Sequence, residues 1–90
     1  MSLGKPVIKG QFMDDEMVAF ATQEAVGALS VMPHEQQVAS YLKNKFEQKY
    51  KSNWHCVVGR NFSAYVTHET GRYIHFYIGQ KGFLIWSTPS

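Results

Sequence analysis

Histidine and cysteine are the side chains in this chain best suited to chemistry, and they stand next to each other once, at His55 and Cys56. A thiol protease needs these two side chains as a nucleophile and a base within hydrogen-bonding reach. The flanking residues predict a β-strand, in which neighbouring side chains point to opposite faces. His55 and Cys56 therefore cannot act as a pair, and we interpret Cys56 as a small core residue.

The remaining candidate sites also lack the spacing that their chemistry requires. The four histidines form no recognised metal-ligand pair, and a single cysteine cannot supply a thiolate cluster. Gly79 and Gly82 flank a predicted hairpin turn but lack the following helix of a phosphate-binding loop. Beyond Asn53 only Glu69 is acidic, so no carboxylate pair arises there. The sequence therefore predicts a binding module without catalytic residues, metal or cofactor.

Length and charge favour one small protein-binding domain. Ninety residues with a formal net charge of +2 predict a single domain over residues 1–90. We interpret the lysines of the second predicted helix as a solvated face, because nucleic-acid binding needs a more concentrated basic surface. One cysteine, no signal region and no long apolar run indicate a cytoplasmic protein without membrane insertion.

Hydrophobic periodicity predicts the elements that position these residues. Residues 7–12 form a strand candidate, and a first helix near 14–31 starts at acidic residues and ends before Pro33. Glu35 opens a second helix, which carries an apolar stripe at four-residue spacing, namely Val38, Leu42, Phe46 and Tyr50. Turn residues, including Gly59 to Asn61, then separate strands near 54–59, 62–67, 72–78 and 82–87. The predicted fold class is α+β, in the order β-α-α-β-β-β-β, with an antiparallel sheet.

The predicted sheet carries large apolar side chains on both faces. Alternation along residues 72–78 separates one set, Ile74, Phe76 and Ile78, from a second set, Tyr73, His75 and Tyr77. Two consecutive helices joined by a short turn can cover only one face. The second face would then be an exposed patch of the kind that marks interfaces. We therefore predict a homodimer that buries this second face.

The chain resembles the dynein light chain family of small dimeric peptide-binding proteins along its whole length. The resemblance is carried by residues 54–56, 58–62, 65–70, 76–77 and 79–80. It implies a strand-swapped homodimer in which strand 62–67 pairs with the partner's sheet. It also implies that a target peptide adds beside that strand by β-augmentation, with a Thr-Gln-Thr core whose glutamine meets the start of the second helix.

The resemblance also implies two sets of site residues. The peptide groove would contain Glu35, Gln36, Asn61, Phe62, Ser63, Ala64, Tyr65, Val66, Thr67, His68, Tyr73, His75, Phe76 and Tyr77. The dimer interface would contain His55, Tyr65, Thr67 and Thr88. Some of these depart from the family pattern, which usually has lysine in place of Gln36, phenylalanine in place of Tyr73 and tyrosine in place of His75. Lys81, in the last strand, also departs from the usual member.

The function implied by the resemblance is that of a non-catalytic hub. Such a protein binds the dynein intermediate chain and other partners with disordered linear motifs, promotes their dimerisation, and is associated with microtubules of the cytoplasmic cytoskeleton. The alternatives are a regulator or inhibitor subunit of another enzyme, and a structural subunit of an axonemal or membrane-associated assembly, both independent of dynein.

Overall fold

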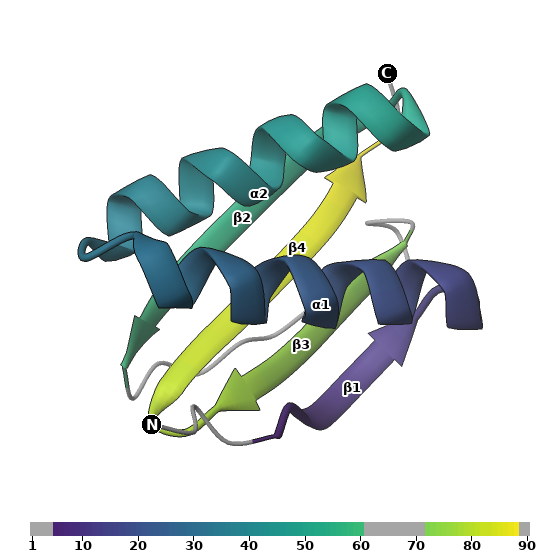
Figure 1. Cartoon of the computed structure of the whole chain (residues 1–90). Helices are drawn as coiled ribbons and strands as arrows, with labels where there is room; N and C mark the ends of the chain where they lie inside the picture. Colours follow the sequence, from purple (N-terminus) through teal and green to yellow (C-terminus); the bar gives the residue numbers. More distant parts are fainter. Residues whose placement is uncertain (1–4, 61–71, 89–90) are drawn as a thin grey trace.

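The computed structural model describes residues 5–60 and 72–88. Its elements run in the order β1 (Val7–Phe12), α1 (Asp15–Val31), α2 (Glu35–Tyr50), β2 (Asn53–Arg60), β3 (Tyr73–Ile78) and β4 (Lys81–Thr88). The strands form one antiparallel sheet in the order β1-β3-β4-β2, and both helices lie over the same face (Figure 1). The predicted α+β class is confirmed. The predicted strand 62–67 lies outside the described residues.

Helix α1 begins where the sequence supplies a cap. The Asp14 carboxylate accepts a hydrogen bond from the Met17 amide at 2.9 Å, and two further acidic residues occupy the first turn. Both features favour a helix N-terminus, because they satisfy free amides and complement the helix dipole. The helix ends at Val31, shortly before Pro33. Its buried positions include three alanines, which allow close packing on the neighbouring elements, at Ala21, Ala25 and Ala28.

Aromatic side chains join α2 to both α1 and the sheet. Phe46 is fully buried, and its ring centroid lies 5.2 Å from that of Phe20 on α1 and 4.8 Å from that of Trp54 on β2. Tyr50 packs on the same group, 5.6 Å from Phe46. Edge-on and tilted ring contacts of this kind add to the stabilisation from apolar burial. The predicted stripe of α2 is therefore the side that faces the core.

The two edge strands of the sheet differ in regularity. β1 contains a register shift between Ile8 and Gly10, with Lys9 at the irregular position. A bulge and a lysine are both features that discourage further strand pairing. β2 instead pairs with β4 in unbroken register from Asn53 to Arg60. The predicted turn therefore does not begin at Gly59, because the ladder to β4 continues through Arg60, and β2 presents a regular outer edge.

We expect Phe46→Ala to lower the free energy of unfolding by about 3–5 kcal/mol, because it removes the ring shared by the two helices and β2. Urea denaturation followed by circular dichroism would measure the change. Val31→Ala is the control, since Val31 is 74% exposed and its truncation should change stability by less than about 0.5 kcal/mol. Equal losses in the two variants would show that the aromatic group is not the centre of the core.

Candidate functional site

The sheet face opposite the helices is a continuous surface of large side chains that no described element covers. Strand register arranges this face in rows across β1, β3, β4 and β2. The first row contains Phe12, Tyr73, Trp86 and His55, and the second contains Gly10, His75, Leu84 and Val57. Phe12 is 60% exposed and Val57 is 42% exposed, while the other large side chains of both rows are half-buried. The predicted second apolar face is therefore present, and we call it the open face.

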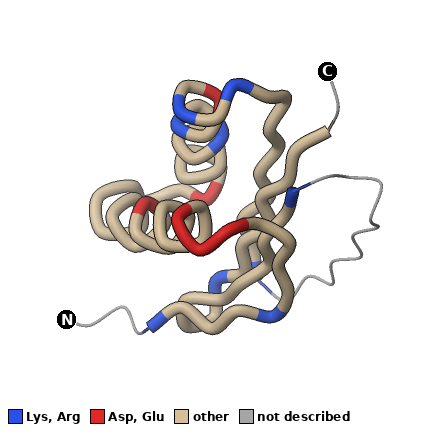
Figure 2. Tube along the Cα trace, turned by 90° about the vertical axis from the view of Figure 1, so that its right-hand side faces the viewer, with Lys and Arg blue, Asp and Glu red and all other residues tan. Residues whose placement is uncertain are grey.

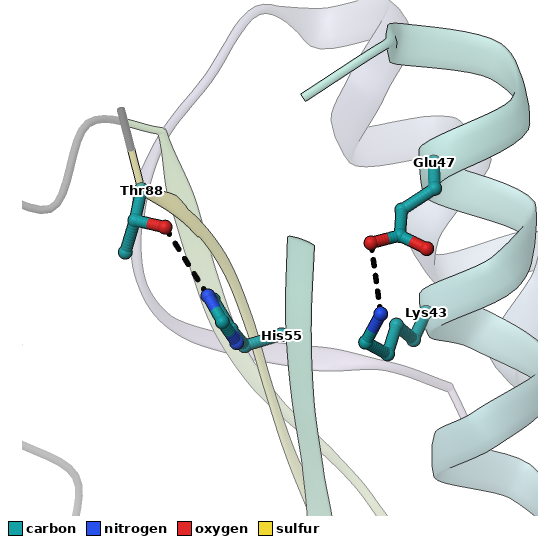
Figure 3. A network of polar contacts seen from close by, with 4 residues as sticks. All are labelled: Lys43, Glu47, His55 and Thr88. Atoms are coloured by element: carbon teal, nitrogen blue, oxygen red, sulfur yellow. Dashed lines mark hydrogen bonds and ion pairs between the residues drawn. The ribbon is translucent and has the colours of Figure 1, made fainter. Parts of the chain in front are cut away.

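Two of the predicted interface residues meet at one end of the open face. His55 Nε2 lies 3.2 Å from Thr88 Oγ1, within hydrogen-bonding distance (Figure 3). The His55 ring also stacks on Trp86, with centroids 5.2 Å apart and planes inclined by 27°. These contacts hold the imidazole against the sheet. The other predicted interface residues, Tyr65 and Thr67, lie outside the described residues.

His75 and Tyr77 form a second polar group on the open face, on β3. Their ring centroids are 5.5 Å apart, and Lys9 Nζ lies 6.0 Å from the Tyr77 ring. Partial burial, and then the charge of Lys9, lowers the pKa of His75 below its ordinary value. The neutral imidazole is therefore favoured, and in that form one ring nitrogen donates a hydrogen bond and the other accepts one. A tyrosine at this position would lack that acceptor nitrogen.

Phe76 corrects one of the sequence expectations. It was predicted to line the peptide groove, but its side chain is fully buried on the helix side of the sheet. There it stacks on Phe83, with centroids 4.9 Å apart and planes inclined by 3°. Neighbouring residues of a strand point to opposite faces, so Phe76 cannot reach the surface that carries His75 and Tyr77. Phe76 is therefore a core residue that packs on the opposite side of β3 from His75 and Tyr77.

The first turn of α2 lies over the end of the sheet where β2 ends and β4 begins. The Glu35 carboxylate forms an ion pair with the Lys81 ammonium, and Lys81 is the ladder partner of Arg60. The hydrogen bond from Lys81 lowers the pKa of Glu35, and the charge of Arg60 acts in the same direction. Lys81 and Arg60 are not among the site residues expected from the sequence. The sequence feature that could have pointed to Lys81 is its departure from the family pattern.

Gln36 belongs to an open hollow beside this turn. The hollow has a volume of about 540 Å³ and is lined by Met32, His34, Gln36, Gln37 and Ser40. His34 occupies the N-cap position of α2 but makes no capping hydrogen bond with its side chain. An incoming acceptor group could therefore approach amides of the first turn. The remaining predicted groove residues lie outside the described residues, namely Asn61, Phe62, Ser63, Ala64, Tyr65, Val66, Thr67 and His68.

The two described parts of the predicted groove lie on opposite sides of the sheet. Glu35 and Gln36 are in the helix layer, whereas Tyr73, His75 and Tyr77 are on the open face. Moreover, β4 separates β3 from the regular edge of β2. An extended ligand beside the β2 edge of one copy therefore cannot reach the β3 side chains of that same copy. A groove that uses both sets needs two copies of the chain.

Figure 2 marks the positions of the lysines along α2. The described contacts of three of them are with other residues of the helix layer. Lys43 pairs with Glu47 at 2.8 Å, Lys45 lies 5.5 Å from the Tyr41 ring, and Lys49 lies 4.4 Å from the Phe20 ring. Stems of this length cover apolar surface while their charges stay hydrated. This arrangement supports the interpretation of a solvated helix face.

The described residues include neither a thiol with a lowered pKa nor a group of metal-ligating side chains. Cys56 packs against the core, as predicted, and burial raises the pKa of its thiol to about 12. Within residues 5–60 and 72–88, no three side chains of metal-ligating type gather at one place. None of the described helices has both the length and the apolar character needed to cross a membrane.

We expect iodoacetamide to alkylate Cys56 in the folded protein at pH 8 at least about 100-fold more slowly than in urea. A pKa of about 12 in place of 9.0 lowers the thiolate population roughly a thousandfold, and the thiolate is the reacting species. Mass spectrometry of timed samples would measure both rates. Comparable rates in the two states would mean that the thiol is not held in the core.

Comparison with known proteins gave one family and several structural neighbours. Residues 5–88 match the family described as dynein light chain type 1. The dynein light chain-like domain of the calcium binding protein FhCaBP2 from Fasciola hepatica is 25% identical. Its native crystal form has a TM-score of 0.82, covering 96% of this chain and 93% of that one. The DLC like domain of CsTAL3 is 16% identical, with a TM-score of 0.80 and 94% coverage of each chain, and it shows the shared fold.

Proposed function

This chain belongs to the dynein light chain family, and we propose that it is a homodimeric hub that binds short linear motifs of its partners by β-strand addition. Members of the family generally form dimers, bind partner peptides without catalysis, and are typically cytoplasmic. In this proposal, residues 62–67 of each copy pair with the other copy's β2. The peptide of a disordered partner, such as the dynein intermediate chain, then lies beside that strand.

The observation that carries this proposal is the open face. It presents aromatic and aliphatic side chains from all four strands of the described sheet, including the exposed Phe12 and Val57. A small domain buries a smaller fraction of its surface than a large one does, and association of two such faces would remove this exposed apolar surface from water. In a dimer with a two-fold axis through this face, the same surface of each copy contacts the other copy.

Two further observations support strand addition and a shared groove. The outer edge of β2 is regular, whereas β1 is irregular at Lys9, so β2 is the better template for another strand. The helix-layer residues Glu35 and Gln36 and the open-face residues His75 and Tyr77 can serve one peptide only if they come from different copies. In this proposal, a peptide can therefore contact both sets of residues only in the dimer.

A dimer of this kind holds two peptides at fixed separation. A partner that is itself dimeric gains affinity from the second site without new contacts, because binding at the first site raises the local concentration of the second peptide. The hub thereby promotes side-by-side association of disordered partners. Through the intermediate chain it would be associated with microtubules of the cytoplasm.

We expect Val57→Lys to convert the dimer into a monomer. Val57 lies within the open face, where its replacement would bring two ammonium groups into a desolvated interface. Analytical ultracentrifugation at micromolar concentration would show the change in mass. Val31→Lys is the matched control, because it makes the same change at an exposed site in the helix layer and should stay dimeric. A parent protein that sediments as a monomer would refute the proposal.

We expect a Thr-Gln-Thr peptide to bind this chain roughly tenfold more weakly than it binds a family member with the usual groove residues, a difference of ~1.4 kcal/mol. Gln36 lacks the cation that is usual there, and His75 offers less aromatic area than tyrosine. Isothermal calorimetry would measure the affinities.

The double variant Gln36→Lys, His75→Tyr should recover much of the lost affinity. Lys43→Gln is a suitable control, because Lys43 is engaged with Glu47 away from the first turn of α2. If neither the parent nor the double variant binds the peptide, the proposed peptide-binding role is wrong.

A further inference from the structure

The ion pair at the start of α2, between Glu35 and Lys81, lies close to a third charged residue, Arg60. Ile78, Lys81 and Arg60 lie in one row across β3, β4 and β2. Ile78 is buried on the helix side, so the row as a whole faces the helix layer. Glu35 reaches down from the first turn of α2 to pair with Lys81. Two cations and one carboxylate therefore meet where α2 begins.

The charges of this cluster do not cancel. Lys81 neutralises Glu35, and the charge of Arg60 remains, which leaves one net positive charge beside the partial positive charge of the helix terminus. The side chains of Lys81 and Glu35 retain 28% and 39% of their exposure, so solvent and ligands can approach them. At such a site an ion pair contributes little to stability, but its charges still attract or repel the charged groups of a ligand.

Without Lys81 the net positive charge of this end would be lost, because only the charges of Glu35 and Arg60 would remain and they are opposite in sign. The Glu35 carboxylate would lose its ion-pair partner in the first turn of α2, and it would oppose an acidic side chain there. A neutral amide would then serve the helix amides as well as a carboxylate does. With Lys81 in place this repulsion is removed, and an acidic side chain gains the attraction of the cations.

We propose that the Glu35–Lys81 ion pair, together with Arg60, makes the groove select an acidic peptide side chain at the position that faces the first turn of α2. This inference rests on the proposed peptide-binding function and names the ligand class of that same site. The preferred ligand carries glutamate or aspartate where the family's usual motif carries glutamine. Lys81 is the residue that determines the preference.

The test compares three synthetic peptides that differ only at the central residue, Thr-Gln-Thr, Thr-Glu-Thr and Thr-Ala-Thr, by calorimetry at low and high salt. The parent dimer should bind the glutamate peptide about fivefold more tightly than the glutamine peptide at low salt, as expected for one partly exposed charge pair. This preference should shrink at high salt, because exposed charges are screened. Lys81→Gln should remove the preference for the glutamate peptide.

Three variants separate this effect from a general change in charge. Lys43→Gln removes the cation of the other ion pair of α2, whose side chains are similarly exposed, and should keep the acidic preference. Lys81→Arg should keep it too. Adding Glu35→Gln to Lys81→Gln removes the remaining carboxylate and should restore binding of the glutamate peptide. Thermal melts would show that each variant folds.

The outcomes distinguish this inference from the function on which it rests. If the parent prefers the glutamine peptide, or if Lys81→Gln keeps the full preference for the glutamate peptide, the ion pair does not set the preference and the inference is wrong, while peptide binding stands. If the parent binds none of the three peptides, the proposed function fails and the inference fails with it.

Discussion

A sheet has two faces, and in this protein both helices cover the same one. The helices follow each other directly, and the short turn through Pro33 leaves no length of chain to carry α2 around the sheet edge. Every strand of the described sheet nevertheless places large side chains on the second face. The rest of the molecule depends on this imbalance, because a domain of this size cannot leave such a surface in water without cost to its stability.

The core makes the arrangement rigid enough to support a site. Phe46 joins Phe20 of α1 and Trp54 of β2, so the helix layer is held to the sheet by rings at one end of α2. At the other end of α2, Glu35 contacts Lys81 of the sheet. The aromatic packing therefore does most to set the place of α2 on the sheet. In the proposed dimer, a groove wall held in place by the core would lower the cost of ordering a ligand.

Much of the fold could be predicted because its signals are local. The spacing of Val38, Leu42 and Phe46 predicts the buried side of α2, and alternation in β3 predicts the two faces of the sheet. The contact between His55 and Thr88 was not predicted. Family resemblance placed both residues at the dimer interface, and strand pairing makes them neighbours although they are 33 positions apart. Three residues of the site were misplaced or missed. Phe76 is in the core, Arg60 continues β2, and Lys81 pairs with Glu35.

The sequence by itself determined the described elements, their faces and the family, because each follows from local periodicity or from contiguous motifs. Only the tertiary structure decided which charged residues pair with each other and which strands lie at the edges of the sheet. The pairing of Glu35 with Lys81 joins residues 46 positions apart, and no local rule connects them. Likewise, the separation of Gln36 from His75 by the thickness of the sheet became visible only when the strands were ordered. Long-range contacts of this kind depend on strand order and register, which local patterns leave open.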